Sequence, residues 1–132
     1  MQNTLKSAVS FTGVGLHTGK PVRMTLRPAS ADYGIWFRRS DVDGDGSGRD
    51  PMVRAIWSAV TPSRLCTVVE NADGVSVSTI EHLMAALAGS AIHNALIEID
   101  GPEVPILDGS AEPFVAGFIA RGLVQQDAPV RA

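Results

Sequence analysis

The sequence has only one cysteine and no long hydrophobic run. The single Cys66 excludes an internal disulfide and any zinc site built from several thiolates. No apolar run approaches the ~20 residues that span a bilayer, and the N-terminus lacks the charged, then apolar, then small-residue order of a signal peptide. We therefore predict no transmembrane segment and a cytoplasmic protein.

Positive charge is also scarce. The chain has 11 Lys and Arg against 14 Asp and Glu, for a net charge of −3, and its basic residues form no cluster. Because a nucleic-acid binder needs a basic patch for the phosphates, nucleic acid is excluded as a partner. The 132 residues suit one domain with a real core. We predict a single domain at 1–124, followed by a tail or linker at 125–132.

The stretch 41–50 is rich in Asp and Gly and begins like a calcium-binding loop. Such a loop requires a bidentate Glu at its twelfth position, which here is Met52. The pattern therefore predicts a flexible surface loop, in which Asp and Gly favour turns, and no calcium site.

The most informative stretch, 78–89, has the pattern of one short helix. Ser78 stands at the N-cap position, Glu81 follows three residues later as in a capping box, and Gly89 suits the left-handed position after the last turn. The stripe expected to face a core consists of Ile80, Leu83, Met84 and Leu87. The other side carries Glu81, His82 and alanines without the charges of a solvated face, so we expect both polar residues in a covered place.

A second helix is predicted after the turn at 108–110. Glu112 and Pro113 suit its first turn, and 121–122, Arg followed by Gly, is a stop signal. Its buried stripe is predicted to consist of Phe114, Val115, Phe118 and Ile119. Several strand patterns with turns between them complete the chain. We predict an α+β fold, a two-layer sandwich with one mixed or mostly antiparallel sheet and two main helices on one face.

The helix layer of this sandwich lacks a cover. The outward side of 78–89 is rich in alanine and holds an acid and an imidazole, so it is expected to meet a partner surface that the chain does not supply. Self-association of two copies through this helix face is one way to cover it.

Glu81 and His82 are adjacent in the predicted helix, so their side chains point about 100° apart and flank one position. In metal hydrolases an imidazole holds zinc, and a nearby carboxylate takes a proton from the metal-bound water. Spacing alone leaves simpler roles open, with Glu81 as the capping-box partner and His82 as a hydrogen-bonded core residue. A catalytic zinc also needs about three protein ligands, and the other histidines, His17 and His93, show no recognisable spacing.

Cys66 and Asp108 are weaker candidates. A nucleophilic Cys66 with His82 as base and Glu81 as orienter is conceivable. The strand-like surroundings of Cys66 instead favour a buried small hydrophobe. Asp108 is a candidate acid near the site, and it also has a sufficient structural role as a turn former.

Three long motifs cover nearly the whole chain in this order: TGVGLHTGK at 12–20, STIEHL followed by AALAG at 78–89, and PEVPILDGSA at 102–111. They resemble the zinc-dependent UDP-3-O-acyl-N-acetylglucosamine deacetylases of bacterial lipid A biosynthesis, which hydrolyse the 2-acetamido group to acetate and a free amine. The resemblance implies that Glu81 is the general base and His82 a zinc ligand. It also implies that the substrate site is lined by Leu16, Leu65, Cys66 and Thr67.

The resemblance covers only the first of two similar α+β domains, whose helix layers face each other across the active site. By analogy, the second domain carries a His and an Asp as further zinc ligands, and a Lys and a His for the oxyanion and the leaving amine. The resemblance thus implies zinc in a site that is incomplete in this chain, UDP-3-O-acyl-N-acetylglucosamine as substrate, and the missing second domain as partner. We expect the isolated chain to be inactive. A non-catalytic binding or scaffold module with the same fold is the alternative.

Overall fold

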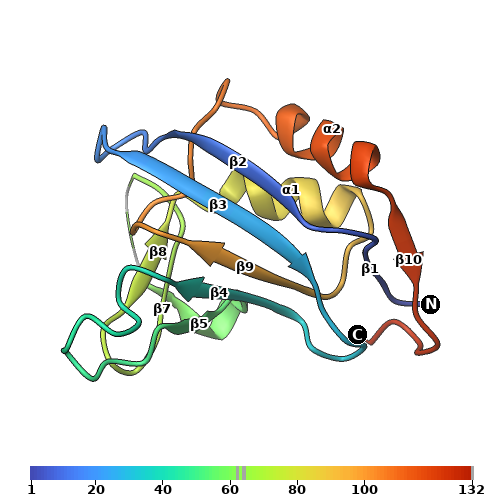
Figure 1. The fold of residues 1–132 in the computed structure, drawn as a ribbon, viewed down its shortest axis with the longest axis horizontal. Helices are drawn as coiled ribbons and strands as arrows, with labels where there is room; N and C mark the ends of the chain where they lie inside the picture. Colours follow the sequence, from blue (N-terminus) through green and yellow to red (C-terminus); the bar gives the residue numbers. More distant parts are fainter. Residues whose placement is uncertain (62, 64, 132) are drawn as a thin grey trace.

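The computed structural model describes residues 1–61, 63 and 65–131. Its main element is a five-stranded mixed sheet, in which all neighbouring strands are antiparallel except the parallel pair β9 and β4 (Figure 1). The strands, in their order across the sheet, are β2 (Val9–Val14), β3 (Pro21–Pro28), β9 (Ala95–Ile99), β4 (Ile35–Arg39) and β5 (Met52–Arg54).

The alternation of side chains explains why these segments are strands. In β3, Val22, Met24 and Leu26 are buried, whereas Arg23 and Arg27 between and beyond them are exposed. This period of two gives the sheet one apolar face and one polar face. The apolar face carries the core.

Two smaller sheets flank the main one. At one end, β1 (Asn3–Leu5) pairs antiparallel with β10 (Leu123–Gln125). On the other side, a short 3-10 helix, η1 (Trp57–Ala59), leads into an antiparallel sheet. Its strands are β6 (Val60–Thr61), β7 (Val68–Glu70) and β8 (Ser76–Ser78). The strands thus form three sheets, whereas the sequence pattern predicted one.

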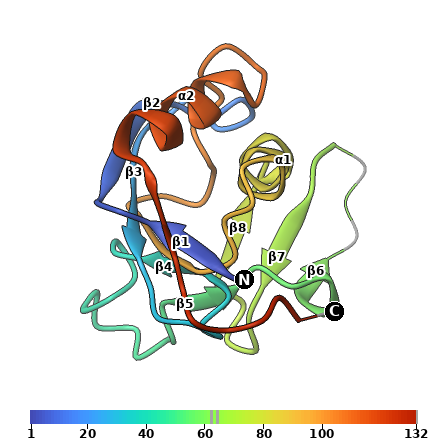
Figure 2. The same ribbon diagram turned by 90° about the vertical axis from the view of Figure 1, so that its right-hand side faces the viewer.

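Two helices, α1 (Glu81–Gly89) and α2 (Glu112–Arg121), lie on the same face of the five-stranded sheet. Figure 2 shows α1 between α2 and the strands β7 and β8. The predicted α+β class, with two main helices on one face, is confirmed.

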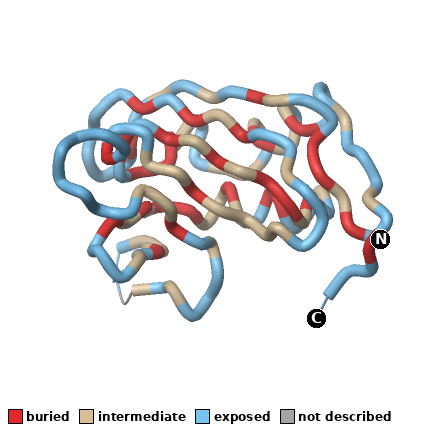
Figure 3. Tube along the Cα trace, turned by 60° about the horizontal axis from the view of Figure 1, so that its bottom comes forward, coloured by how far each residue is buried: buried red, intermediate tan, exposed pale blue. Residues whose placement is uncertain are grey.

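Aromatic packing attaches α2 to the sheet. The ring of Phe11 in β2 meets the rings of Phe114 and Phe118 edge-on, with centroids 5.0 and 6.2 Å apart. Gly117 allows this approach, because a Cβ there would lie 2.6 Å from the Phe11 ring. Buried residues gather in the middle of the molecule, and the outer loops are mostly exposed (Figure 3).

The ends of α1 differ from the prediction. Ile80 is the N-cap residue and no side chain caps the helix. Ser78 belongs to β8, and its hydroxyl donates a hydrogen bond of 3.2 Å to the Pro102 carbonyl. The left-handed residue after the helix is Ala91, with φ of 55°, and not Gly89. The capping predictions for Ser78 and Gly89 were therefore wrong, because strand pairing and not helix capping determines the position of Ser78.

The predicted start and stop of α2 are confirmed, with Glu112 and Pro113 in the first turn and a φ of 82° at Gly122. The predicted stripe is too wide. Phe114 and Phe118 are buried and Val115 is half-buried, but 74% of Ile119 is exposed. Only a narrow stripe of α2 meets β2, so Ile119 falls outside the core.

Two segments outside the main sheet complete the description. Residues 41–50 form exposed turns, as predicted, with Val42 as their buried residue. After β10 the chain packs along the N-terminus: Ala128 is buried, and its carbonyl accepts a hydrogen bond of 2.8 Å from the Gln2 N–H. Residue 132 of the predicted tail lies outside the described residues, and the boundary at 124 stays a prediction. Within the described ranges, no helix has the length and apolar character to cross a membrane.

Candidate functional site

Glu81 and His82 occupy the first turn of α1, directly after the hairpin of β7 and β8, and both are half-buried. The Glu81 Oε1 accepts a hydrogen bond of 2.7 Å from the backbone N–H of Thr67. Glu81 is therefore not the capping-box partner that its spacing also allowed. The segment before β7, which is distant in sequence, orients its carboxylate.

The structure places the predicted substrate residues in two segments. Thr67 and Cys66 are half-buried in the bend before β7, where Thr67 contacts Glu81, and Leu65 is 77% exposed. The predicted strand begins only at Val68, so Cys66 does not lie in a strand and is not fully buried. Leu16, 58% exposed, lies in the separate loop after β2.

Asp108 is bound within the turn before α2. The hydroxyl and the backbone N–H of Ser110 donate to Asp108 Oδ1 at 2.7 and 2.9 Å. These bonds hold the pKa of Asp108 below its ordinary value, and positive charge on His82 adds to the effect. The bonds from Ser110 thus hold Asp108 in the turn that precedes α2. Sequence analysis offered Asp108 both as an acid near the site and as a turn former; its bonds to Ser110 fit the second role, and the first stays a prediction.

Glu103 is a buried carboxylate in the same region that sequence reasoning did not single out. It is 1% exposed, and the Thr79 hydroxyl donates to its Oε2 at 2.5 Å. The available signal was an acidic residue inside the largely apolar run that continues through Val104 to Leu107. Acidic residues are rarely fully buried without partners, but the sequence did not show which partners Glu103 has.

The described residues offer only part of the ligands that a catalytic metal ion needs. Within residues 1–61, 63 and 65–131, no group of three or more His, Cys, Asp or Glu side chains is arranged to hold a metal. His93 lies elsewhere, where its Nδ1 accepts a hydrogen bond of 2.9 Å from the Asn3 N–H. A catalytic zinc takes about three protein ligands. His82 therefore fits one position of such a site, and the described residues do not form the whole of it.

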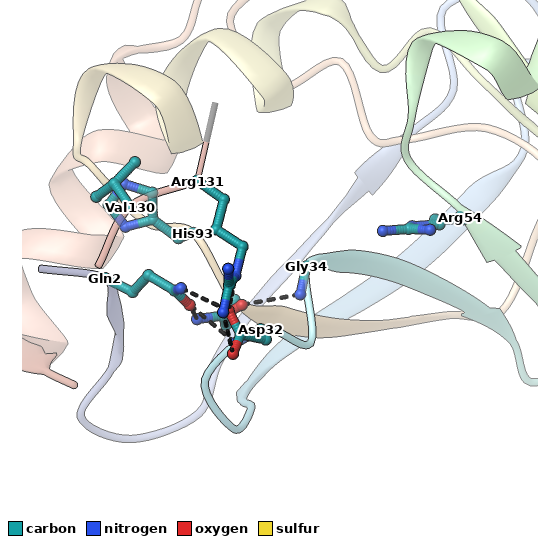
Figure 4. A pocket seen from close by; sticks show the side chains of 8 residues that line it. Gln2, Asp32, Gly34, Arg54, His93, Val130 and Arg131 are labelled. Atoms are coloured by element: carbon teal, nitrogen blue, oxygen red, sulfur yellow. Dashed lines mark hydrogen bonds and ion pairs between the residues drawn. The ribbon is translucent and has the colours of Figure 1, made fainter. Parts of the chain in front are cut away.

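A cavity of about 260 Å³ is lined by residues near both chain termini, among them Gln2 and Arg131, and by His93, which follows α1. In Figure 4, Gln2 and Arg131 point toward Asp32, whereas Arg54 lies apart from them. The Gln2 Nε2 and the Arg131 Nε each lie 2.8 Å from Asp32 Oδ1. This cavity does not include Glu81 or His82. Gln2, Asp32 and Arg131 bind one another there, and the cavity is separate from the motif that carries Glu81 and His82.

Comparison with known proteins identifies relatives along the whole chain. The family model described as LpxC: UDP-3-O-acyl N-acetylglycosamine deacetylase matches residues 2–132. A UDP-3-O-acyl-N-acetylglucosamine deacetylase from Phenylobacterium zucineum (strain HLK1) is 52% identical over 130 residues, which are 98% of this chain and 43% of that protein. Proteins with the same name are 50% identical in Vibrio cholerae serotype O1 (strain M66-2), over 98% of this chain and 41% of theirs, and 48% identical in Actinobacillus succinogenes, over 97% and 40%. The chain spans about two fifths of the length of these curated relatives.

Proposed function

The chain belongs to the UDP-3-O-acyl N-acetylglycosamine deacetylase family, and on this basis we propose that it is the N-terminal part of a zinc-dependent deacetylase. The proposed reaction is hydrolysis of the N-acetyl group of UDP-3-O-acyl-N-acetylglucosamine in lipid A biosynthesis. The observation that carries the proposal is the 2.7 Å hydrogen bond from the Thr67 N–H to Glu81, which orients a carboxylate beside His82. A positioned carboxylate next to an imidazole suits hydrolysis assisted by a metal.

Glu81 is the proposed general base. Its Oε1 is held by the Thr67 N–H, which fixes the side chain and leaves Oε2 to take a proton from the attacking water. The water oxygen then bonds to the amide carbon, the carbon–nitrogen bond breaks, and acetate and an amine result. The amine needs a proton as it leaves, and we propose that a group outside this chain donates it.

His82 is the proposed zinc ligand of this chain. The chemistry that a bound zinc ion supplies is Lewis acidity, which makes a water molecule easier to deprotonate. Because the described residues present one imidazole and not a set of three ligands, the other ligands come from outside them. We expect this chain alone to bind zinc weakly and to release little or no acetate.

The substrate is proposed to contact Leu16, Leu65, Cys66 and Thr67. Leu16 and Leu65 are 58% and 77% exposed, so both side chains are accessible to a ligand. Thr67 links this group to the base, since its backbone N–H is the donor to Glu81. Binding of the substrate or of a second domain would cover these side chains.

A missing second domain is the proposed partner. Ala85 and Ala88 on α1 are exposed, and 74% of Ile119 on α2 is exposed on the same helix layer. A second domain packed over this layer would cover the apolar surface and supply the remaining groups of the site. This arrangement agrees with a chain that spans about two fifths of its relatives.

The test mixes this chain with the separately expressed remainder of the Phenylobacterium zucineum relative. We expect the two to associate, to retain zinc and to release acetate from UDP-3-O-acyl-N-acetylglucosamine, with neither part active alone. Glu81→Gln should lower acetate release about 100-fold or more without weakening association, because it removes only the proton acceptor.

The matched control is Glu112→Gln, the same change in the first turn of the other helix. It should leave acetate release unchanged. Absence of both association and activity would contradict the proposal. Association without acetate release would favour the alternative, a binding or scaffold module with the same fold.

A further inference from the structure

Glu103 lies where three segments meet. Its Oε1 accepts hydrogen bonds from the backbone N–H groups of His17 and Thr18, at 3.0 and 2.9 Å, and its Oε2 accepts from the Thr79 hydroxyl at 2.5 Å. The His17 N–H is also 3.1 Å from Oε2. One carboxylate therefore joins the loop after β2 to the residue that connects β8 with α1.

The charge of Glu103 is balanced by dipoles. Among the described residues, the donors at this carboxylate are two backbone N–H groups and a hydroxyl, with no Lys or Arg. Burial raises the pKa of Glu103, but the bonds from Thr79, Thr18 and His17 outweigh it and hold the pKa below its ordinary value. A buried charge is tolerated only when such partners are in place, so the three segments are held together by the need to satisfy it.

The loop at 15–20 is shaped around this carboxylate. A Cβ on Gly15 would collide with Glu103 Oε1 and with the Thr18 hydroxyl, so only glycine allows the backbone to pass so close. Backbone bonds fix the opposite side: the Ser78 N–H donates to Pro102 at 2.8 Å, and the Val104 N–H donates to Ser78 at 3.1 Å. Glu103 is thus held in register with the end of β8.

Thr79 turns the chain from β8 into α1 in a conformation that a β-branched residue rarely adopts. Its φ is 60°, in the left-handed region. Its N–H donates to the Thr67 carbonyl at 2.9 Å, and its hydroxyl donates to Glu103. These two bonds hold an unfavourable backbone geometry two residues before Glu81.

We propose that Glu103 is a positioning residue that couples the loop at 15–20 to the first turn of α1, so that Leu16 keeps one arrangement relative to Glu81 and His82. The proposal rests on the proposed function in taking Leu16 as a substrate contact and Glu81 and His82 as the reacting pair. Glu103 acts through Thr79 on one side and through the N–H groups of His17 and Thr18 on the other. In the deacetylase it would align the sugar with the base.

The first test is Thr79→Val, which keeps the branched shape and removes the hydroxyl. Amide hydrogen exchange of the 132-residue chain should become about 10-fold faster at His17 and Thr18, although Thr79 donates to neither, because their shared acceptor is released. Thr25→Val is the matched control, since it removes the hydroxyl bonded to Ser10 at 2.8 Å on the outer face of the sheet. Unchanged exchange at both amides in Thr79→Val would overturn the coupling.

A double-mutant cycle with Glu103→Gln tests whether Glu103 is the residue that couples Thr79 to the amides of His17 and Thr18. After Glu103→Gln, adding Thr79→Val should change exchange at His17 and Thr18 no further, since the link is already broken. Independent effects that add would show that Glu103 is not the link. Glu70→Gln, an exposed carboxylate at the end of β7, controls for the loss of one charge.

The activity of the chain mixed with the second domain distinguishes a positioning role of Glu103 from a purely structural one. Thr79→Val should lower kcat/KM for UDP-3-O-acyl-N-acetylglucosamine about 10-fold or more, because small displacements of a base from its substrate are costly. Altered exchange with unchanged kcat/KM would overturn the positioning role. If the unsubstituted mixture releases no acetate, the proposed function fails, and the exchange measurements still decide the coupling, because they need neither zinc nor substrate.

Discussion

At the residue scale, three carboxylates of similar chemistry have three different environments. Glu103 is buried and accepts from three donors, Glu81 is half-buried and held by one backbone N–H, and Asp108 is exposed and bonded to Ser110. Hydrogen bonds to a carboxylate stabilise its ionised form, so the most strongly bonded group is the least suited to exchange protons. Glu103 therefore suits a fixed structural charge.

The depressed pKa of Glu103 predicts a pH-dependent contribution to stability. Since the folded pKa lies below the ordinary value of 4.5, the contribution is complete above about pH 4.5 and is lost as the pH falls through the folded pKa. Glu103→Gln should therefore lower the free energy of unfolding by about 1–3 kcal/mol at pH 7, and by less at pH 3. Urea unfolding at both pH values measures this. An equal loss at both would contradict an ionised Glu103, and Glu70→Gln should show no such trend.

At the element scale, the two helices use glycine differently. Gly117 in α2 faces Phe11 and Val9, and a Cβ there would lie 2.6 Å from the Phe11 ring, which Phe114 and Phe118 confine. At Gly89, the last residue of α1, an added Cβ would meet nothing within 4 Å. The same residue type is thus required by packing in one helix and unconstrained by packing in the other.

This contrast predicts opposite effects of one substitution. Gly117→Ala should lower the free energy of unfolding by about 1–3 kcal/mol, because overpacking outweighs the helix propensity of alanine. Gly89→Ala should raise it by up to about 1 kcal/mol, because the added methyl group meets no atom and alanine favours a helix. Thermal unfolding of both variants measures the pair. Stabilisation by Gly117→Ala would show that the ring of Phe11 moves aside at little cost.

At the scale of the whole molecule, the five-stranded sheet covers one side of the helices and leaves the opposite side exposed. The exposed side includes Ala85 on α1 and Ile119 on α2, and a hollow of about 200 Å³ lies between the ends of the helices. Exposed apolar surface of this kind is typical of a surface that meets a partner. The proposed second domain and a second copy of the chain would compete for it.

This competition predicts that the chain alone self-associates through its helix layer and that the second domain displaces the copy. Light scattering should show a mass that rises with concentration, and a one-to-one complex once the second domain is added. Ala85→Glu should abolish the rise by placing a charge in the contact, whereas Thr12→Glu, at an exposed position of β2, should not. A monomer at every concentration would contradict self-association.

The sequence by itself determined the features that depend on local periodicity. The alternation of Val22, Met24 and Leu26 specified a half-buried strand, and Glu112, Pro113 and Gly122 marked the ends of a helix. The α+β class followed from the sum of such segments. The resemblance rested on contiguous motifs, so the family was also accessible from the sequence.

Only the tertiary structure decided which distant segments meet. The carboxylate of Glu81 binds a backbone group 14 residues earlier, and the Glu103 carboxylate binds amides 85 and 86 residues earlier. The division into three sheets and the parallel pairing of β4 with β9 are likewise long-range. Helix and strand patterns report which way a side chain faces, but not which backbone N–H will reach it. The partners of the buried and half-buried acids therefore emerged only when the segments packed together.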